Sequence, residues 1–549
     1  MDLRPAVHAG PAWHTLLDGD ARALVERDHL LPYLHRQRWF SGKARRATSA
    51  RFVDWGTLSA GEEPSFLALV DVAYADGGID RFFLPMGTRS GQAALALEHE
   101  MPTAVLARIA GVREGVLHDR VEDLLATALL EAIETAREIA LRHGVVQAAP
   151  TSAFEAVSGP ARVPALRPRR LAGEQSNTSV LYDDRFILKL IRRLEPGLNP
   201  DYEIGYHLTE RVGFRRVPRL AGGLDYRGAD GTRTILGILQ GLVDHQANGW
   251  DHGVDQARRS YDRALAHAGP PPDPVTDAAS LVALSRGPLP PIVCEVVGGY
   301  LDTARVLGRR TAELHLALAR AVGDPAFEPE PVETGQLARL AHEMTAHAGQ
   351  ALDALEAALG RVPERLSGRA RQLVDGRAAL IERFDELARL EAAVTRIRVH
   401  GDYHLGQVLY DRGDFVILDF EGEPLRPLEE RRRKHPAVKD VAGMLRSFSY
   451  AAYAGLFAST ADRREDFERL EPWAKLWYTW VSSSFLRAYC AAAEGASFLP
   501  ADASTLDVLL RAFLLDKALY ELLYELNNRP DWLRIPLWGI LGLVSSSRP

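Results

Sequence analysis

Short apolar runs separated by turns dominate the chain as far as about residue 240, and apolar residues at helical spacing dominate after about residue 295. Residues 66–74 and 82–84 are apolar runs on either side of an Asp-Gly-Gly turn, which predicts a β-hairpin. Residues 121–143 have helical periodicity and are followed by Gly144, so we expect a helix there. The chain therefore begins with a strand-rich part.

A second strand-rich section follows. Residues 179–182 and 186–190 flank an Asp-Asp turn and predict another hairpin. Residues 201–211, preceded by a proline, predict a short helix, and residues 234–240 predict a buried strand.

The remainder is expected to be helical. Helical spacing covers residues 301–321, 333–360 and 366–391, and helices resume through residue 527. The clear β interruption lies at 396–420. The pattern thus indicates a small strand-containing part followed by a large helical part with a hairpin inside it.

The composition is that of a globular protein, with 46% hydrophobic and 25% charged residues. A formal net charge of −7 argues against binding to nucleic acid or anionic lipid through charge alone. There are two cysteines, and the longest late apolar run, at 535–544, is too short to span a bilayer. We therefore expect a cytoplasmic protein with no nucleic acid and no membrane partner.

Lysine supplies six of the 66 basic residues. A lysine inside a motif of this chain therefore indicates a place where a compact ammonium group is wanted.

The most informative segment is residues 396–424, RIRVHGDYHLGQVLYDRGDFVILDFEGEP. Its apolar runs predict a hairpin with Asp402 and Gln407 before one strand and Asp419 at the end of the next. An Asp, an amide five residues later and a second Asp form the catalytic arrangement of protein-kinase-like enzymes. Because Mg²⁺ prefers such hard oxygen ligands, we expect Asp402 to be the catalytic base and Gln407 with Asp419 to bind the metal.

Two other interpretations of this segment stay open. A surface hairpin with solvated acids would carry no chemistry. A metallophosphatase is suggested by GDYH, although Leu405 replaces the last glycine of the GDxHG motif and no companion cluster of His and Asp has ligand spacing. His400 and His404 are expected to orient the loop rather than to bind a metal.

A kinase must also hold a triphosphate, yet the loops GxGxxG and GxxxxGK[ST] are absent. In their place stands AGEQSNTS (172–179), whose hydroxyl, amide and backbone groups can donate to phosphate. Lys189 lies in the next strand, and Glu203 on the following helix is placed to pair with it. The alternative is a strand lysine that extends to solvent and an ordinary surface glutamate. The predicted nucleotide-binding residues are Ser176, Asn177, Thr178, Ser179, Lys189, Glu203, and Gln240 and Leu242 at a hinge whose backbone can bond adenine.

A stripe of phenols, carboxylates and an amide lies on one face of the helix expected at 516–534. Such a stripe suits a polyhydroxylated ligand, and the alternative is tyrosines packed at a helix edge beside solvated glutamates. The cationic run 431–434 is equally explained as a solvated helix end, and Asp440 is a further candidate. The predicted acceptor residues are His404, Glu421, Lys434, Arg446, Tyr450, Tyr520, Glu521, Tyr524, Glu525 and Asn528.

The chain resembles the bacterial maltokinases, which use ATP to phosphorylate maltose at its reducing-end hydroxyl. HGDxH and the hydroxyl-rich loop are shared with aminoglycoside-phosphotransferase-like kinases, whereas QRWFSGK (37–43) and the YELLYELNNRPDW tract distinguish the maltokinase branch. Ser449 and HPAVKD (435–440) depart from the usual pattern on the acceptor side. The matching segments, in family order over nearly the whole chain, are QRWFSGK, EQSNTS, ILKLIRRLEPGLNPDYE, LGRRTAELHLALA, HGDYHLGQ, DFEGEP, DVAGMLRSF and KALYELLYELNNRPDWL.

The resemblance implies an α+β, bilobal protein-kinase-like fold. Residues 1–95 would form an N-terminal cap, 96–246 the nucleotide-binding part, and 247–549 a helical lobe with the catalytic hairpin and the acceptor site. It also implies ATP and Mg²⁺ as cofactors, maltose 1-phosphate as a product that feeds α-glucan and glycogen synthesis, and trehalose synthase as a partner. The alternatives are a kinase of an aminosugar such as glucosamine or of an aminoglycoside, whose cationic acceptor would suit Glu521 and Glu525, and an inactive scaffold.

Overall fold

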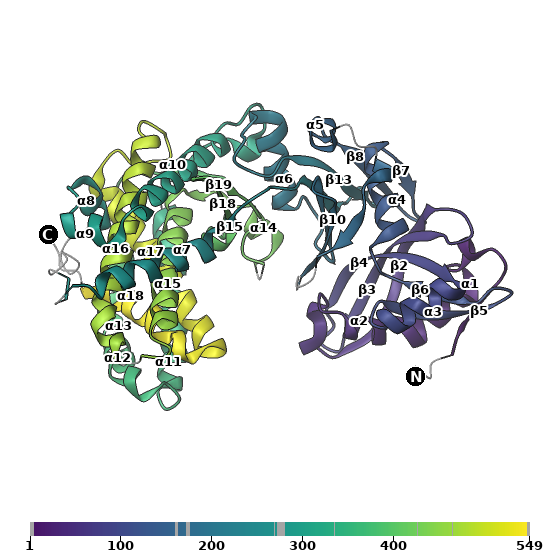
Figure 1. Ribbon diagram of the computed structural model, residues 1–549, viewed down its shortest axis with the longest axis horizontal. Coiled ribbons are helices and arrows are strands. Elements are labelled where there is room, and N and C mark those ends of the chain that lie inside the picture. The colour runs from purple at the N-terminus through teal and green to yellow at the C-terminus, as the bar shows by residue number, and fades with distance from the viewer. Residues whose placement is uncertain are drawn as a thin grey trace. The chain divides into compact units, whose positions relative to one another are not determined.

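The computed structural model describes residues 5–159, 163–171, 176–267, 270–271, 280–333, 335–424, 426–463 and 465–545. The chain forms two compact units, residues 1–243 and 244–549 (Figure 1). The first unit contains two β-sheets and the second is mainly helical, which confirms the expected α+β organisation.

The first sheet of the N-terminal unit, here called the cap sheet, holds the expected hairpin at 66–84. It is antiparallel except where its edge strand β1 runs parallel to β5. Its strands continue to His118, so the expected boundary at residue 95 falls inside a helix, α3 (Gly91–Glu100). In spatial order its strands are β1 (Val7–Ala9), β5 (Val105–Gly111), β6 (Gly115–His118), β4 (Ile79–Ser90), β3 (Ser65–Tyr74) and β2 (Ala47–Ser59), and β12 (Arg193–Leu194) also pairs with β4.

The second sheet of this unit is antiparallel and contains the expected hairpin of β10 and β11. The short helix α6 (Pro200–Tyr206) follows it, started by the side chain of Asn199, which accepts a hydrogen bond from the N–H of Asp201. In spatial order the strands are β7 (Glu138–Ala140), β8 (Val145–Pro150), β13 (Leu220–Arg227), β14 (Arg233–Gly241), β11 (Phe186–Ile191), β10 (Asn177–Tyr182) and β9 (Pro168–Arg170).

The helix expected at 121–143 is shorter than its periodicity indicates. It covers Asp123–Glu134 (α4), and the chain then turns at Ala136, whose φ is +51°, to enter the edge strand β7. Ile139 is buried between exposed neighbours, the alternation of a half-buried strand, which explains why this end of the run pairs with β8. Helix α4 packs against strands of both sheets and gives them a common core.

A separate core lies under the cap sheet. Apolar side chains from the sheet and from the N-terminal helices α1 (Gly19–Leu24) and α2 (Leu31–Arg36) meet there, with the rings of Phe40 and Phe82 tilted against each other at 5.2 Å between centroids. This core is distinct from the one around α4, so the cap is a structural layer of its own within the N-terminal unit.

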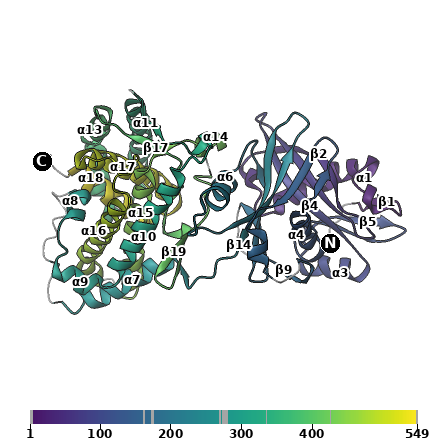
Figure 2. The ribbon, with the colours of Figure 1, turned by 90° about the horizontal axis from the view of Figure 1, so that it is seen from above.

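Long helices build the second unit. Figures 1 and 2 show α10, α15, α16 and α17 side by side, and residue contacts join α10 to α16 and α15 to both α16 and α17. The helix expected at 366–391 is split at Gly376 into two. The helices are α7 (Gly249–Ala264), α8 (Leu281–Arg286), α9 (Pro291–Val297), α10 (Tyr300–Leu318), α11 (Gln336–Ala358), α12 (Glu364–Asp375), α13 (Arg377–Ala388), α14 (Leu428–Arg431), α15 (Val438–Ser459), α16 (Asp466–Ala492), α17 (Ala503–Asn528) and α18 (Arg534–Ser545).

Two small antiparallel sheets interrupt the helices. The expected hairpin is formed by β18 (Val408–Asp411) and β19 (Asp414–Ile417), with β15 (Ala247–Asn248) on the other side of β18. The strand expected at 396–399 pairs elsewhere, as β17 (Thr395–Ile397) between β16 (Glu330–Pro331) and β20 (His435–Pro436). Within the described residues, no helix has the length and apolar character needed to cross a membrane.

Candidate active site

The loop between β17 and β18 lies on one face of helix α15. Asp440, Gly443 and Ser447 follow each other at spacings of three and four residues, so all three face the same side of the helix. The hydroxyl of Ser447 accepts a hydrogen bond of 3.0 Å from the N–H of Leu405. A Cβ atom on Gly443 would lie 2.6 Å from the carbonyl oxygen of Tyr403, so only glycine lets the loop approach this closely.

Asp440 fixes the first residues of this loop. Its carboxylate accepts hydrogen bonds from the backbone N–H groups of His400, at 2.7 Å, and Gly401, at 2.9 Å. His315 contacts the same carboxylate at 3.1 Å and holds Tyr489 with its other ring nitrogen. Burial alone would raise the pKa of Asp440, but these partners lower it overall. Asp440 was expected on the acceptor side, and the structure shows that it holds the backbone of the loop instead.

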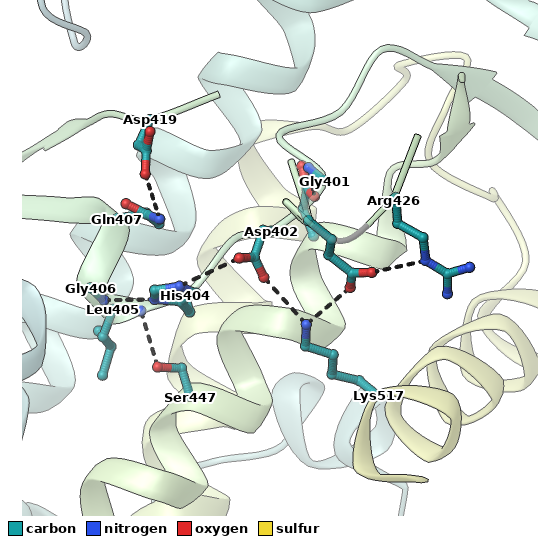
Figure 3. Close-up of polar contacts among 12 residues, drawn as sticks. Gly401, Asp402, His404, Leu405, Gly406, Gln407, Asp419, Arg426, Ser447 and Lys517 are labelled. Carbon is teal, nitrogen blue, oxygen red and sulfur yellow. Dashed lines mark hydrogen bonds and ion pairs between the residues drawn. The ribbon is translucent and has the colours of Figure 1, made fainter. Parts of the chain in front are cut away.

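Asp402 is held by a lysine from another helix. The ammonium nitrogen of Lys517, on α17, lies 3.3 Å from Asp402 and 3.2 Å from Glu423 (Figure 3). Burial would raise the pKa of Asp402, but Lys517, His404 and His400 together lower it. In the same way, burial would lower the pKa of Lys517, but the two carboxylates raise it. Asp402 is therefore ionised at neutral pH, as a base must be.

His404 completes the surroundings of Asp402. Its Nδ1 accepts a hydrogen bond of 3.0 Å from the N–H of Gly406, so the proton of the neutral ring is on Nε2. Nε2 lies 3.8 Å from Asp402, and burial lowers the pKa of His404. The Nε2–H of His400 donates a hydrogen bond of 3.0 Å to the carbonyl oxygen of Leu418, the residue after β19. Both histidines thus orient the loop.

Gln407 and Asp419 come together at the base of the hairpin. The amide nitrogen of Gln407 donates to Asp419 at 2.9 Å, which joins the end of the loop to the residue after β19 (Figure 3). Asp419 has a φ of +67°, a conformation uncommon for a residue other than glycine and typical of functional sites. An amide and a carboxylate in direct contact offer two hard oxygens to one cation, a donor set that fits Mg²⁺.

In the N-terminal unit, Lys189 lies on β11 and pairs with a carboxylate of α6. Its ammonium nitrogen lies 3.2 Å from Asp201, whose side chain is fully buried. Glu203, the expected partner, lies on the same helix and is also buried. The sequence did not single out Asp201.

The expected phosphate-binding segment is only partly described, since residues 172–175 lie outside the described residues. Ser176 is exposed and Asn177 half-buried, but Thr178 and Ser179 are buried in β10, where Ser179 is the register partner of Lys189. The hydroxyl of Thr178 accepts a hydrogen bond of 2.8 Å from Arg192.

The expected hinge begins where β14 ends. Gln240 is buried in β14, and Leu242 is 37% exposed. The N–H of Gly241 donates to the carbonyl of Arg219 and the N–H of Leu242 to that of Arg185. These two backbone N–H groups therefore already have acceptors within the N-terminal unit.

Several predicted acceptor residues form the interface between α15 and α17. Arg446 donates to Glu521 at 2.9 Å, and the hydroxyl of Tyr450 donates to Glu525 at 3.1 Å. Arg529 also pairs with Glu525, at 2.7 Å. Burial raises the pKa of Glu525, against the effect of Arg529 and Tyr450.

The other predicted acceptor residues are spread out. Lys434 donates to Glu330 at 2.6 Å and to the carbonyl of Pro325. Its ammonium group is therefore held beside the small sheet of β16, β17 and β20 and not at the acceptor stripe. The ring of Tyr520 lies 4.8 Å from the ammonium of Lys517, which brings it to the Asp402 site. Figure 3 shows Asp402 between His404 of the same loop and Lys517.

Two further predicted acceptor residues lie near the end of α17, and a third follows β19. Tyr524 is 48% exposed, and the amide of Asn528 donates to the carbonyl of Tyr524 one turn before it. Glu421 is half-buried, and its carbonyl accepts a hydrogen bond from Arg431.

Lys517 and Glu423 are site residues that the sequence reasoning did not assign. The scarcity of lysine in this chain was the available signal for Lys517, which is one of the six.

Comparison with known proteins extends these observations. Residues 33–123 match the family model of the maltokinase N-terminal cap domain, which confirms the resemblance for the cap. The chain is 29% identical over 408 residues to a glucosamine kinase of Streptacidiphilus jiangxiensis, covering 72% of this chain and 78% of the relative. It is 27% identical over 374 residues to a glucosamine kinase of Mycolicibacterium smegmatis, covering 67% and 77%.

Solved structures share the fold. A glucosamine kinase in complex with glucosamine, ADP and inorganic phosphate has a TM-score of 0.59 at 23% identity, over 92% of this chain and 96% of that one. A second crystal form of a glucosamine kinase has a TM-score of 0.62 at 23% identity, over 97% and 99%. The kinase-like fold expected from the sequence is thereby confirmed.

Proposed function

We propose that the protein is an ATP-dependent sugar kinase whose acceptor is an aminosugar such as glucosamine. The observation that carries the proposal is the loop on α15, which presents an ionised Asp402 while the same loop ends in the contact between Gln407 and Asp419. The glucosamine kinases among the relatives and structural neighbours support the sugar acceptor.

The reaction follows from these groups. Asp402 accepts the proton of the acceptor hydroxyl as its oxygen forms a bond to the γ-phosphorus, and the bond from that phosphorus to the bridging oxygen breaks to release ADP. Lys189 binds the nucleotide phosphates, with Asp201 orienting its ammonium. Gln407 and Asp419 would hold Mg²⁺, which neutralises phosphate charge when bound.

An aminosugar is favoured by the relatives, which are named glucosamine kinases. Asp402 and Glu423 already bind the ammonium of Lys517, at 3.3 and 3.2 Å, so the ammonium group of the acceptor would need other partners.

Maltose is the second candidate, because residues 33–123 match the maltokinase cap. Products such as maltose 1-phosphate for glycogen synthesis, a trehalose synthase partner and a cytoplasmic location belong to this part of the proposal and rest on the resemblance.

Phosphorus NMR of reactions with Mg·ATP tests the proposal. Glucosamine and maltose are supplied separately and then in competition, and we expect a new phosphomonoester signal from glucosamine. A signal from maltose alone, at the position of an anomeric phosphate, would replace the aminosugar by maltose. Absence of any product signal across a panel of sugars would refute a sugar kinase.

A further inference from the structure

The strand that carries Lys189 continues directly into the cap sheet. Lys189 lies in β11 of the second sheet, and Arg193 and Leu194, which follow closely, form β12 and pair with Phe82 and Arg81 of β4. Arg192 is the residue at which the chain passes from one sheet to the other, and its carbonyl accepts a hydrogen bond of 2.8 Å from the N–H of Phe83.

The side chain of Arg192 is completely buried at this crossover. One end of its guanidinium donates to Thr178 of β10 at 2.8 Å, and the other pairs with Asp119 of the cap at 3.1 Å. Asp119 balances the charge of this buried guanidinium, although the contact between them does not have the geometry of a hydrogen bond, and the bond to Thr178 fixes the opposite side of the group. Arg192 therefore connects the cap to the first residues of β10.

The motif QRWFSGK supplies the aromatic part of these surroundings. The ring of Trp39 lies 4.8 Å from the guanidinium of Arg192, within the range of a cation–π contact. Gln37 fixes the motif by donating to the carbonyl of Thr103 at 2.8 Å, and a Cβ on Gly42 would lie 2.1 Å from the hydroxyl of Tyr74. These contacts hold the motif, and with it the ring of Trp39, beside Arg192.

We propose that Arg192 is a positioning residue through which the cap domain fixes the nucleotide-binding strands. Arg192 is bonded to Thr178, and Thr178 precedes Ser179, the register partner of Lys189. The cap side chains around Arg192 hold β10 and β11 in one position and so determine where the ammonium of Lys189 is presented. This inference rests on the proposed function, because it takes Lys189 to be a nucleotide ligand.

The test removes the connection without leaving a buried charge. The double variant Asp119→Asn with Arg192→Met replaces the ion pair, an exchange that buried ion pairs often tolerate. Thr178→Val removes the acceptor and keeps the ion pair, so it serves if the double variant does not fold. Calorimetric titration with Mg·ADP gives nucleotide affinity, and steady-state kinetics give kcat and the KM values for ATP and sugar.

We expect each variant to weaken Mg·ADP binding and raise the KM for ATP about fivefold, the effect of one ordinary hydrogen bond. The kcat and the KM for sugar should stay unchanged, and the triple variant should be no weaker than the double, because both act through one bond. Thr88→Val is the matched control, since Thr88 is a buried cap threonine that donates to the carbonyl of Pro64 at 2.9 Å. It should lower the melting temperature without changing nucleotide affinity.

Lys189→Met distinguishes a failure of the role of Arg192 from a failure of the nucleotide site. If it weakens Mg·ADP binding while the crossover variants do not, the role of Arg192 is refuted and the proposed function stands. Additive losses in the triple variant, or a loss confined to kcat, would also refute that role. If Lys189→Met leaves Mg·ADP affinity unchanged, the nucleotide site itself is wrongly assigned and the inference about Arg192 fails with it.

Discussion

Replacement of Asp440 by asparagine tests how the catalytic loop is held. The carboxylate has two oxygens that accept from the N–H groups of His400 and Gly401, and one of them also contacts His315. Asparagine has nearly the same shape as aspartate, but its amide offers one oxygen as acceptor and one nitrogen as donor. Whichever way its amide turns, an N–H of the variant faces a buried backbone N–H, which is left without a partner.

The loss can be worked out from these contacts. One hydrogen bond to a charged acceptor, worth about 1.5–3 kcal/mol, disappears, and His315 loses its ionised partner. We expect the free energy of unfolding to fall by about 3 kcal/mol. Because Asp402 follows Gly401, the loosened loop should also lower kcat by about tenfold to a hundredfold, the usual consequence of a misplacement of about 1 Å.

Urea unfolding and kcat at saturating substrate measure the two effects, with Asp414→Asn as the control. Asp414 pairs with Arg310 at 2.7 Å in the turn of the same hairpin, so its replacement should lower stability while leaving kcat within about twofold. If Asp440→Asn lost stability but kept kcat as the control does, the loop would not depend on this carboxylate.

The same variant has a defined pH dependence. Because the pKa of Asp440 is lowered in the folded protein, its stabilisation is present above the pKa of the unfolded chain, about 4, and is lost as the pH falls through the folded value. The stability difference between wild type and Asp440→Asn should therefore be constant above about pH 4 and shrink below it. A difference that grew on acidification would contradict this sign.

Three further variants probe the site. Asp402→Asn should lower kcat by at least about a hundredfold and leave Mg·ADP affinity unchanged in calorimetry; full activity would refute the base assignment. Lys517→Met should move the acid limb of the kcat profile to higher pH, because Lys517 holds down the pKa of Asp402, whereas Lys517→Arg should not; an unmoved limb would contradict this. Gly443→Ala should lower the urea midpoint and kcat together, because its Cβ would meet the carbonyl of Tyr403, and a wild-type midpoint would show that the loop can move away.

The residues of the hairpin could be predicted because they are close in sequence. Asp402, Gln407 and Asp419 lie on one loop and one adjoining strand, so the apolar pattern alone places them on connected elements. The contact between Lys189 and Asp201 could not be predicted in this way. Asp201 and Glu203 are two residues apart on α6, and the sequence contains nothing that fixes the rotation of this helix against β11, so it could not show that Asp201 lies 3.2 Å from Lys189.

Contacts between distant segments escaped the sequence pattern. Lys517 reaches Asp402 from α17, and Arg192 reaches Asp119 from another sheet; both depend on how whole elements pack. The helix expected at 121–143 was too long for a related reason, because Ile139 fits a helical stripe and a half-buried strand equally well. Pairing with β8 decides for the strand.

The cap and the predicted acceptor residues belong to different parts of the chain. The match to the maltokinase cap and the similarity to glucosamine kinases therefore carry different weight for the identity of the acceptor. The match to the maltokinase cap covers residues 33–123, all within the N-terminal unit, where its side chains surround Arg192. The predicted acceptor residues all lie in the helical unit, most of them on α15 and α17. The 408 residues aligned with a glucosamine kinase exceed the 243 residues of the N-terminal unit, so that similarity must extend into the helical unit. The similarity to a glucosamine kinase thus reaches the unit that holds the predicted acceptor residues, whereas the cap match is confined to the N-terminal unit. For this reason an aminosugar is the first candidate to assay.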